Sequence, residues 1–67
     1  MEWISVKDKL PEKNVRVIGC LNYYGEPFNV SVYILNEDNK WYDLSSISIS
    51  SCEVDYWMPI PKIDDKN

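Results

Sequence analysis

The strongest pattern in the chain is an alternation of apolar residues over positions 28–35. Phe28, Val30, Val32 and Ile34 are each separated by one residue. This period of two is typical of a β-strand, in which successive side chains point to opposite faces of the sheet. We therefore predict a strand with one apolar face, and we expect that face to form part of the core.

Three further segments have the composition of strands. They cover positions 15–22, 40–44 and 52–58, which are rich in β-branched and aromatic residues. Gly19, inside the first segment, indicates either a β-bulge or a close approach by another group. The Ser-rich segment 45–51 fits an edge strand or a loop, and we favour a loop with a strand-like end.

Turn-forming residues separate these strands. Residues 24–27 predict a turn between the first two strands, and the polar residues 36–39 predict a hairpin between the second and third. Pro59 and Pro61 force the chain out of the sheet, because proline has no amide hydrogen for a strand ladder. These short links favour an antiparallel four-stranded meander in chain order.

The N-terminal arm carries apolar residues that can pack on this sheet. Trp3, Val6 and Leu10 recur at offsets of three and four. Ser5 can cap one short helical turn, which Pro11 then stops. The expected fold class is mainly β, or a small α+β protein at most, with the meander packed by the N- and C-terminal arms.

The length of the chain sets its domain organisation. A chain of 67 residues has a single core and no large enclosed cleft, because it buries only about 60% of the surface that its unfolded form exposes. We predict one domain over residues 1–61 and a flexible tail over residues 62–67. The indole rings of Trp3, Trp41 and Trp57 are expected to converge in the core.

Charge and cysteine usage narrow the classes of ligand. The net charge is −4 and there is no histidine, which disfavours binding of a nucleic-acid backbone and excludes the usual zinc sites. We expect no metal, no cofactor and no membrane span, since no apolar run reaches roughly 20 residues. The lack of a signal peptide predicts a cytoplasmic protein, in which Cys20 and Cys52 are free thiols rather than one bridge.

No catalytic constellation is visible in the chain. General acid–base or nucleophilic catalysis needs a nucleophile beside a base, or two carboxylates with separated pKa values. Asp43, Glu53 and Asp55 are spaced like outward strand positions, which is typical of solvated charges, and Cys52 has no histidine partner. We therefore predict that the protein is not an enzyme.

Two segments at the ends of the chain carry a resemblance to a known family. Residues 3–11 follow the pattern W-I-S-V-x-x-x-L-P, and residues 57–61 follow W-M-P-x-P. With β-rich sequence and Trp41 between them, the chain resembles the small phage and prophage proteins of domain-of-unknown-function family 551. The resemblance implies a phage or mobile-element origin and assigns no activity to particular residues. The Ser-rich stretch before Cys52 departs from that pattern.

The leading functional hypothesis is a protein-binding module. Between positions 17 and 61 there are six acidic residues and a single lysine, Lys40. Tyrosine rings are rigid and have a polar tip, which suits a binding surface. We expect Tyr33 to lie at the surface together with Tyr23 and Tyr24. We expect a phage-encoded inhibitor of a host defence protein, anti-CRISPR-like, that occludes a basic site. The residues expected to bind this partner are Tyr23, Tyr24, Glu26, Glu37, Asp38, Asp43, Glu53 and Asp55.

Three other interpretations of the same residues stay open. The acids can be a solvated face that keeps a small protein soluble. A homo-oligomer could sequester a nucleotide signal between subunits, using aromatic rings with Arg16 or Lys40. A structural or accessory role in a virion is the third alternative.

Overall fold

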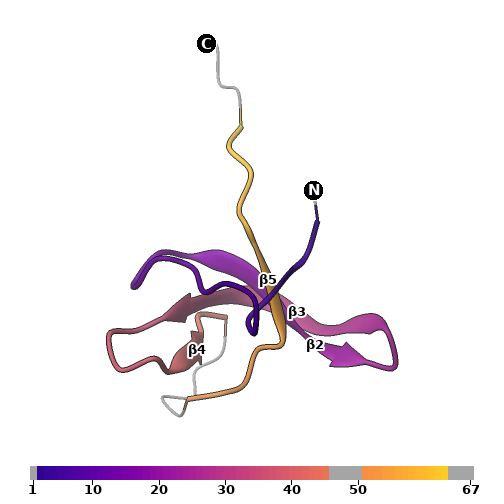
Figure 1. Cartoon of the computed structure of the whole chain (residues 1–67). Coiled ribbons are helices and arrows are strands. Elements are labelled where there is room, and N and C mark those ends of the chain that lie inside the picture. Colours follow the sequence, from indigo (N-terminus) through magenta and orange to yellow (C-terminus); the bar gives the residue numbers. More distant parts are fainter. Residues whose placement is uncertain (1, 46–50, 64–67) are drawn as a thin grey trace.

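A single antiparallel β-sheet makes up the protein. The computed structural model describes residues 2–45 and 51–63 (Figure 1). The strands follow the order β1-β5-β2-β3-β4 across the sheet, and no helix capable of crossing a membrane occurs in these two ranges. The strands are β1 (Ile4–Ser5), β2 (Val17–Tyr23), β3 (Glu26–Leu35), β4 (Trp41–Asp43) and β5 (Tyr56–Pro59).

The mainly β fold class is confirmed, but the sheet has five strands rather than four and is not a meander. β5 pairs with β2 and with the short β1, instead of following β4 in the sheet. The N-terminal segment, expected to be an arm over the sheet, contributes the edge strand β1 through Ile4, which lies opposite Trp57. The two segments that carry the family resemblance therefore lie side by side.

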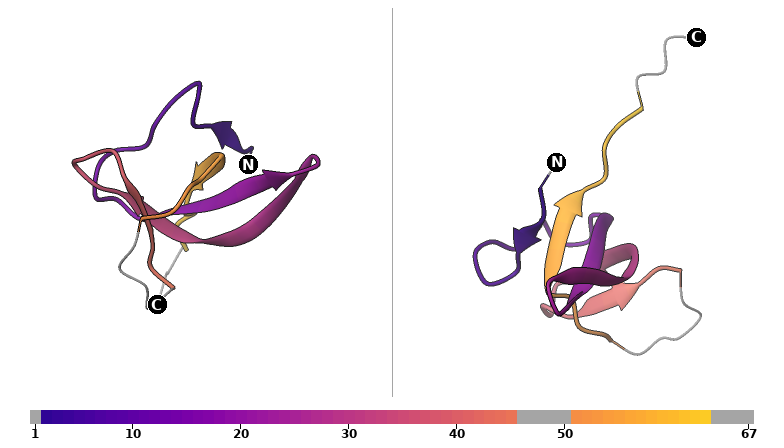
Figure 2. Two further views of the ribbon diagram at one scale, coloured as in Figure 1. Left: turned by 90° about the horizontal axis from the view of Figure 1, so that it is seen from below. Right: turned by 90° about the vertical axis from the view of Figure 1, so that its right-hand side faces the viewer.

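The segment that leads into β5 forms hydrogen bonds with two strands that are not neighbours in the sheet, β4 and β2. Cys52 forms an isolated antiparallel bridge with Trp41 in β4, and its amide donates to the Trp41 carbonyl oxygen at 2.9 Å. Three residues later the amide of Asp55 donates to the carbonyl oxygen of Cys20 in β2, also at 2.9 Å. This path curls the sheet around its core, as the two views in Figure 2 show.

The core lies on the face of the sheet enclosed by this curl. Tyr33 and Leu35 in β3 are buried there, whereas Val30 on the same strand is 55% exposed. The expectation that the Val/Ile face of β3 forms the core is therefore wrong, and so is the placement of Tyr33 at the surface. The buried cluster consists of Val17, Tyr33, Leu35, Trp41, Val54 and Trp57, with Ile4 and Val6 packed against it.

A β-bulge decides which side chains of β3 face the core. Gly19 lies opposite Ser31 but Leu21 lies opposite Phe28, so β3 has one extra residue between these pairs. Asn29, at that point, has a φ of 55°, in the left-handed region. The hydroxyl of Tyr33 donates to the Asn29 carbonyl oxygen at 2.8 Å, which satisfies this buried phenol and secures the bulge.

Gly19 is required by the close approach of the Tyr33 ring. A Cβ atom at this position would lie 2.7 Å from Cδ2 of Tyr33 and 3.1 Å from Cγ1 of Val54. The first distance is one that real Cβ atoms essentially never show, and the second is tighter than most Cβ contacts. The expected close approach at Gly19 is therefore confirmed, and it coincides with the register shift of the bulge.

Two of the three indole rings lie in the core. Trp41 and Trp57 are buried, and Nε1 of Trp57 donates to the carbonyl oxygen of Lys9 at 2.9 Å. This bond connects the core to the turn after β1, where the amides of Asp8 and Lys9 both donate to the Ser5 carbonyl oxygen. Trp3 is only half-buried and lines a surface pocket, so the convergence of all three indoles is not observed.

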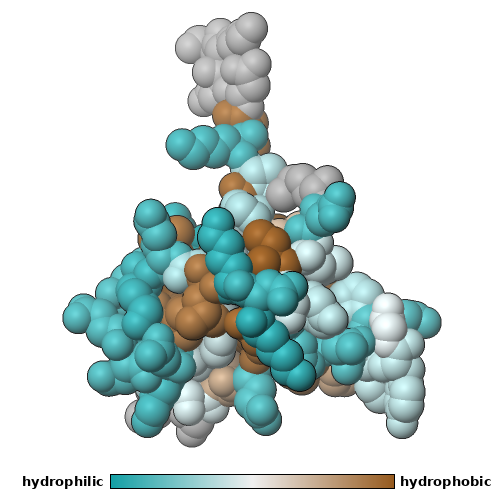
Figure 3. Space-filling model, in the orientation of Figure 1, coloured by the Kyte–Doolittle hydropathy of each residue, from teal (hydrophilic) through white to brown (hydrophobic). Residues whose placement is uncertain are grey.

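Apolar side chains also reach the surface. In the orientation of Figure 1, hydrophobic residues form a group near the centre of the molecule, framed by hydrophilic side chains (Figure 3). Beyond Pro59 the chain leaves the sheet, as the prolines predict, and residues 60–63 extend away from it (Figure 1). The expected Ser-rich loop falls largely on residues 46–50, which lie outside the described ranges.

Candidate functional site

The β2–β3 hairpin ends in a two-residue turn at one end of the sheet. Its central residues, Tyr24 and Gly25, have φ values of 51° and 87°. Two successive left-handed residues define a type I′ turn, which matches the twist of the flanking strands. The side-chain oxygen Oδ1 of Asn22 accepts a hydrogen bond from the Gly25 amide at 2.9 Å and braces the turn.

Three aromatic rings gather at this turn, and we call them the aromatic tip: Tyr23, Tyr24 and Phe28. The Tyr23 ring lies edge-on to Tyr24 with centroids 4.7 Å apart, and 5.4 Å from the centroid of Phe28. All three rings are exposed, Tyr24 to 88%. Contacts between the rings restrict their rotamers, so the tip presents a preorganised aromatic surface with little entropy left to lose on binding.

Tyr24 holds its backbone conformation at a cost. A left-handed backbone costs most L-residues about 1–2 kcal/mol, and Asn or Gly is the usual choice at this turn position. The Tyr24 side chain is nearly fully exposed, and its edge-on contact with Tyr23 offsets only part of that cost. Strain of this kind at an exposed residue points to a use for the side chain outside the fold.

Asp55 ties the hairpin end to β5. Its Oδ2 atom accepts a hydrogen bond from the Asn22 amide at 2.8 Å, next to the turn that Asn22 braces. The carboxylate therefore supports the tip, while its half-buried position keeps part of it in contact with solvent.

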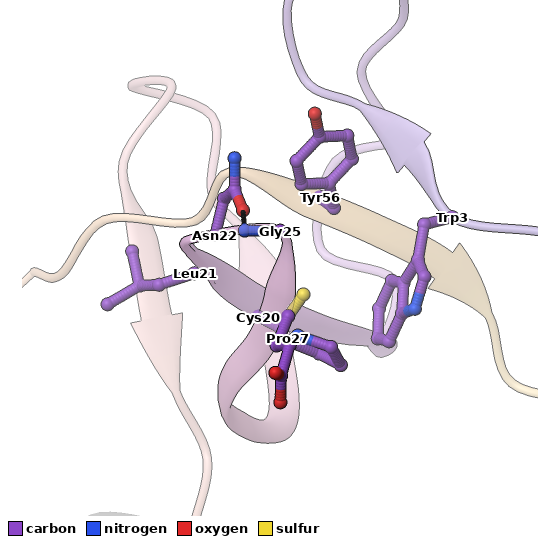
Figure 4. A pocket seen from close by; sticks show the side chains of 8 residues that line it. Trp3, Cys20, Leu21, Asn22, Gly25, Pro27 and Tyr56 are labelled. Carbon is purple, nitrogen blue, oxygen red and sulfur yellow. Dashed lines mark hydrogen bonds between the residues drawn. The ribbon is translucent and has the colours of Figure 1, made fainter.

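A pocket of about 180 Å³ opens beside the aromatic tip (Figure 4). The rings of Trp3 and Tyr56 lie on two sides of it, and the Cys20 side chain lies beside Pro27. Glu26 contributes the one charge among the lining residues. The pocket is lined by Trp3, Cys20, Leu21, Asn22, Gly25, Glu26, Pro27 and Tyr56.

The two thiols differ in their accessibility. Both cysteines are free, Cys20 is buried and Cys52 is exposed. Burial raises the pKa of both thiols, and a nearby carboxylate raises each further, Asp55 at Cys20 and Asp43 at Cys52. Because the two pKa values shift in the same direction, access to the sulfur decides the rate, and we expect a disulfide reagent such as Ellman's reagent to modify one thiol per chain faster than the other in the native protein. Equal rates for Cys20 and Cys52 in the folded chain would contradict this arrangement.

The eight residues expected to bind a partner do not form one patch. Tyr23, Tyr24 and Glu26 lie together at the hairpin end, with Asp55 behind them. Glu37 and Asp38 lie in the β3–β4 turn, at the opposite end of the ten-residue strand β3 (Figure 1). A strand of that length spans roughly 30 Å, so one small partner surface cannot cover both ends. Glu53 is exposed in the segment between Cys52 and β5.

Asp43 has a structural role instead. Its Oδ1 atom accepts hydrogen bonds from the Ser31 hydroxyl at 2.7 Å and from the amide and hydroxyl of Ser45 at 2.9 and 2.7 Å. The two serine hydroxyls also contact each other closely. These bonds, that from Ser31 first, lower the pKa of the Asp43 carboxyl and fix the chain as it leaves β4.

The lowered pKa of Asp43 predicts a contribution to acid stability. A folded pKa below the unfolded value means that the stabilisation is present above the unfolded pKa and is lost as the pH falls through the folded pKa. We expect Asp43→Asn to lower the free energy of unfolding by about 1 kcal/mol at neutral pH. Denaturant titrations should show this gap closing in acid, and a gap that is the same at pH values on both sides of the carboxyl range would contradict the role of the charge.

The described residues hold no group of three side chains able to bind a metal. Sequence reasoning found the tip through its tyrosines, but it missed Phe28, Trp3 and Tyr56. Phe28 was assigned to the core because the bulge is not visible in the alternation. Trp3 and Tyr56 meet Cys20 only through the β1–β5–β2 pairing, which no local pattern encodes.

Comparison with known proteins gives a family and no activity. A family model described as "Protein of unknown function (DUF551)" matches residues 2–62. No curated protein and no solved structure matches the chain. Because the match spans nearly the whole sequence, the chain belongs to this family, as the two terminal segments indicate.

Proposed function

We propose that this member of a family of unknown function is a non-enzymatic protein-binding module whose binding site is the aromatic tip. The observation that carries the proposal is Tyr24, an almost fully exposed ring held on a strained turn. Tyrosine is one of the residues most enriched among the anchors of protein interfaces, together with tryptophan and arginine. A rigid hairpin that projects from one end of the sheet can deliver such an anchor into a partner.

The charges around the tip indicate the kind of partner. Glu26 follows the turn directly, and Asp55 supports it from β5. Negative charge beside aromatic rings favours a basic surface, since arginine and lysine both pair with carboxylates and stack on tyrosine rings. We propose a partner with a basic surface. In its finer form, the proposal is a phage-encoded inhibitor of a host defence protein that uses such a surface to hold nucleic acid.

Tyr24→Asn separates binding from folding. Asparagine adopts the left-handed conformation readily, so we expect the variant to be as stable as the wild type or more stable by up to about 1 kcal/mol. The same change removes the exposed ring and should abolish recovery of the partner. The measurement is affinity capture from a bacterial lysate with quantitative mass spectrometry, paired with denaturant unfolding of both chains.

Ile63→Asn provides the control. Ile63 is an almost fully exposed apolar residue. It belongs to the segment 60–63, which follows β5 and leaves the sheet away from the β2–β3 hairpin (Figure 1). We expect this variant to recover the same partner as the wild type, and we expect that recovery to fall with added salt. A partner that Tyr24→Asn recovers in wild-type amounts would disprove the tip as the binding site.

Sequestration of a nucleotide by the pocket is the weaker candidate. The pocket lining contains the Glu26 carboxylate and no cationic residue, so a phosphate there would be repelled. Arg16 and Lys40 belong to the other end of the sheet, where β2 and β4 begin. A structural or accessory role in a virion does not require the aromatic tip. Tyr24→Asn should leave such a role intact, whereas our proposal expects the variant to lose its partner.

A further inference from the structure

The pocket beside the aromatic tip is built by three strand pairings. Tyr56 of β5 lies opposite Cys20 of β2, so their side chains share one side of the sheet. Asn22 is two residues further along β2, and Pro27 of β3 lies opposite it on the same side. Trp3 precedes β1, two residues before the position opposite Tyr56. These side chains lie on the side of the sheet away from the core and gather around a cavity of about 180 Å³ (Figure 4).

The walls of this pocket suit a cation that carries an apolar stem. The rings of Trp3 and Tyr56 lie on two sides of it, and both residues are half-buried, so part of each ring stays open to a ligand. The face of an aromatic ring carries negative charge and attracts a cation placed within about 6 Å of its centre, most strongly for tryptophan. Leu21 and Pro27 add apolar atoms to the lining, which favours the methylene stem of a long side chain.

The charge in the lining is acidic. Glu26, which follows the turn, is the one charged residue among the described residues of the lining. Because Glu26 lies opposite Tyr23 in the ladder, its Cβ atom points to the other side of the sheet from Asn22 and Pro27. Its side chain is exposed, so its carboxylate acts at the rim of the pocket and not in its floor.

Asp55 adds a second negative charge close to the floor. Its Oδ2 atom accepts a hydrogen bond from the Asn22 amide at 2.8 Å, and its own amide donates to the Cys20 carbonyl oxygen at 2.9 Å. The pKa of the Cys20 thiol is raised by burial first and by the charge of Asp55 second. A further negative charge is therefore disfavoured at the pocket, and a positive one is favoured.

We infer that this pocket binds the guanidinium group of an arginine side chain contributed by the partner of the aromatic tip. The inference rests on the proposed function for the existence of that partner. A guanidinium group is planar, stacks on aromatic rings, pairs with carboxylates and is more weakly hydrated than the ammonium group of lysine. The cavity is smaller than the roughly 300 Å³ at which sites for drug-sized ligands begin, so its volume suits one side chain.

The pocket and the aromatic tip are continuous. Gly25 belongs both to the turn that presents Tyr24 and to the lining of the pocket. A protein surface that contacts the Tyr24 ring therefore also reaches the pocket. Arginine is among the residues that most often anchor an interface by filling such a pocket. Tyr24 itself does not line the cavity, which allows the tip and the pocket to be tested apart.

Titration of the full chain with a small arginine analogue tests the inference without any partner. The probe is N-acetyl-arginine methylamide, and its matched control is N-acetyl-citrulline methylamide, in which a neutral urea group replaces the guanidinium. NMR shifts of the Trp3 indole N–H and the Gly25 amide report binding at the pocket. We expect saturation with a dissociation constant on the order of 1 mM for the arginine analogue, and about tenfold weaker binding of the citrulline analogue.

Two variants locate the site. Trp3→Leu keeps an apolar side chain but removes the ring face, so we expect it to weaken binding of the arginine analogue about threefold. Glu26→Gln should also weaken it about threefold. Its matched control is Glu37→Gln, which removes the same charge in the turn at the other end of β3 and should leave the affinity unchanged. Denaturant unfolding of each variant confirms that it is folded.

Three results would overturn the inference. Equal affinities for the arginine and citrulline analogues would show that the pocket recognises apolar surface alone. Unchanged binding in Trp3→Leu would place the probe elsewhere, and a lysine analogue that binds as tightly would contradict the choice of arginine. These results do not depend on the tip. If the analogue fails to bind while Tyr24→Asn still loses the partner, the inference falls and the proposed function stands.

Discussion

Trp57→Ala should leave the chain largely unfolded at room temperature. The ring belongs to the buried cluster and its Nε1 donates to the Lys9 carbonyl oxygen. Removing a buried tryptophan costs about 3–5 kcal/mol, and a domain of this size rarely has more than about 3–5 kcal/mol in total. Loss of the cooperative transition in denaturant titrations followed by circular dichroism is the expected result.

Two further variants show what Trp57 does. Trp3→Ala removes the same ring from a half-buried position and should cost only about 1–2 kcal/mol. Trp57→Phe keeps an aromatic ring in the core but removes the hydrogen bond to Lys9 and reduces the side-chain volume. Its loss of stability therefore measures these two contributions together. If Trp3→Ala were as damaging as Trp57→Ala, the assignment of Trp57 to the core and of Trp3 to the surface pocket would be wrong.

Gly19→Ala should have the second largest effect. The added methyl group would lie 2.7 Å from Cδ2 of Tyr33, a ring that is buried and tied by its hydroxyl to Asn29. The ring cannot move aside without losing that bond, so we expect a cost of about 2–3 kcal/mol from overpacking. The midpoint of urea unfolding measures this cost.

Gly25→Ala is the matched control for Gly19→Ala. Nothing lies within 4 Å of a Cβ atom at Gly25, but its φ of 87° strains any L-residue, which costs about 1 kcal/mol. A second test combines Gly19→Ala with Tyr33→Leu: the smaller side chain should make the alanine nearly neutral in that background. Equal costs of Gly19→Ala with and without Tyr33→Leu would show that the ring is not the obstacle.

Local sequence patterns were sufficient to predict the strands β2 to β5 and the two hairpins that join β2, β3 and β4. The alternation in β3, the turn at Tyr24 and Gly25 and the polar turn before Lys40 all lie within short stretches of chain. The place of β5 could not be predicted in this way, because it depends on hydrogen bonds between Val17–Cys20 and residues some 40 positions later. Strands that are close in the chain usually pair with one another, which would place β5 beside β4. In this protein β5 pairs with β2 and β1 instead.

The face of β3 that enters the core was also beyond local pattern. Both sets of alternating residues in β3 contain apolar side chains, and the set with Tyr33 and Leu35 supplies the larger ones. Large rings fill a small core more completely than valines do, which gives that side the greater gain in buried area. The bulge at Asn29 then places Phe28 on the core side of the sheet, away from Val30.

The candidate site was predictable to the extent that it is made by one turn. Tyr23, Tyr24 and Glu26 are neighbours in the sequence, so their joint exposure follows from the hairpin alone. Glu37, Asp38 and Asp43 were included in the site because the middle of the chain is acidic. An excess of acidic residues in the sequence does not show where those residues lie in the fold. The strain at Tyr24 could be recognised only from its backbone conformation in the structure.

The central claim is that the core lies on the Tyr33 and Leu35 side of the sheet and that the valines of β3 face out. Methyl NMR with a soluble paramagnetic probe, on a dilute sample, tests it through matched residues. Val30 and Leu44, at 55% and 48% exposure, should broaden strongly, whereas Val17 and Leu35, at 2% and 1%, should not. Broadening of Val17 and Leu35 with Val30 and Leu44 protected would contradict the account.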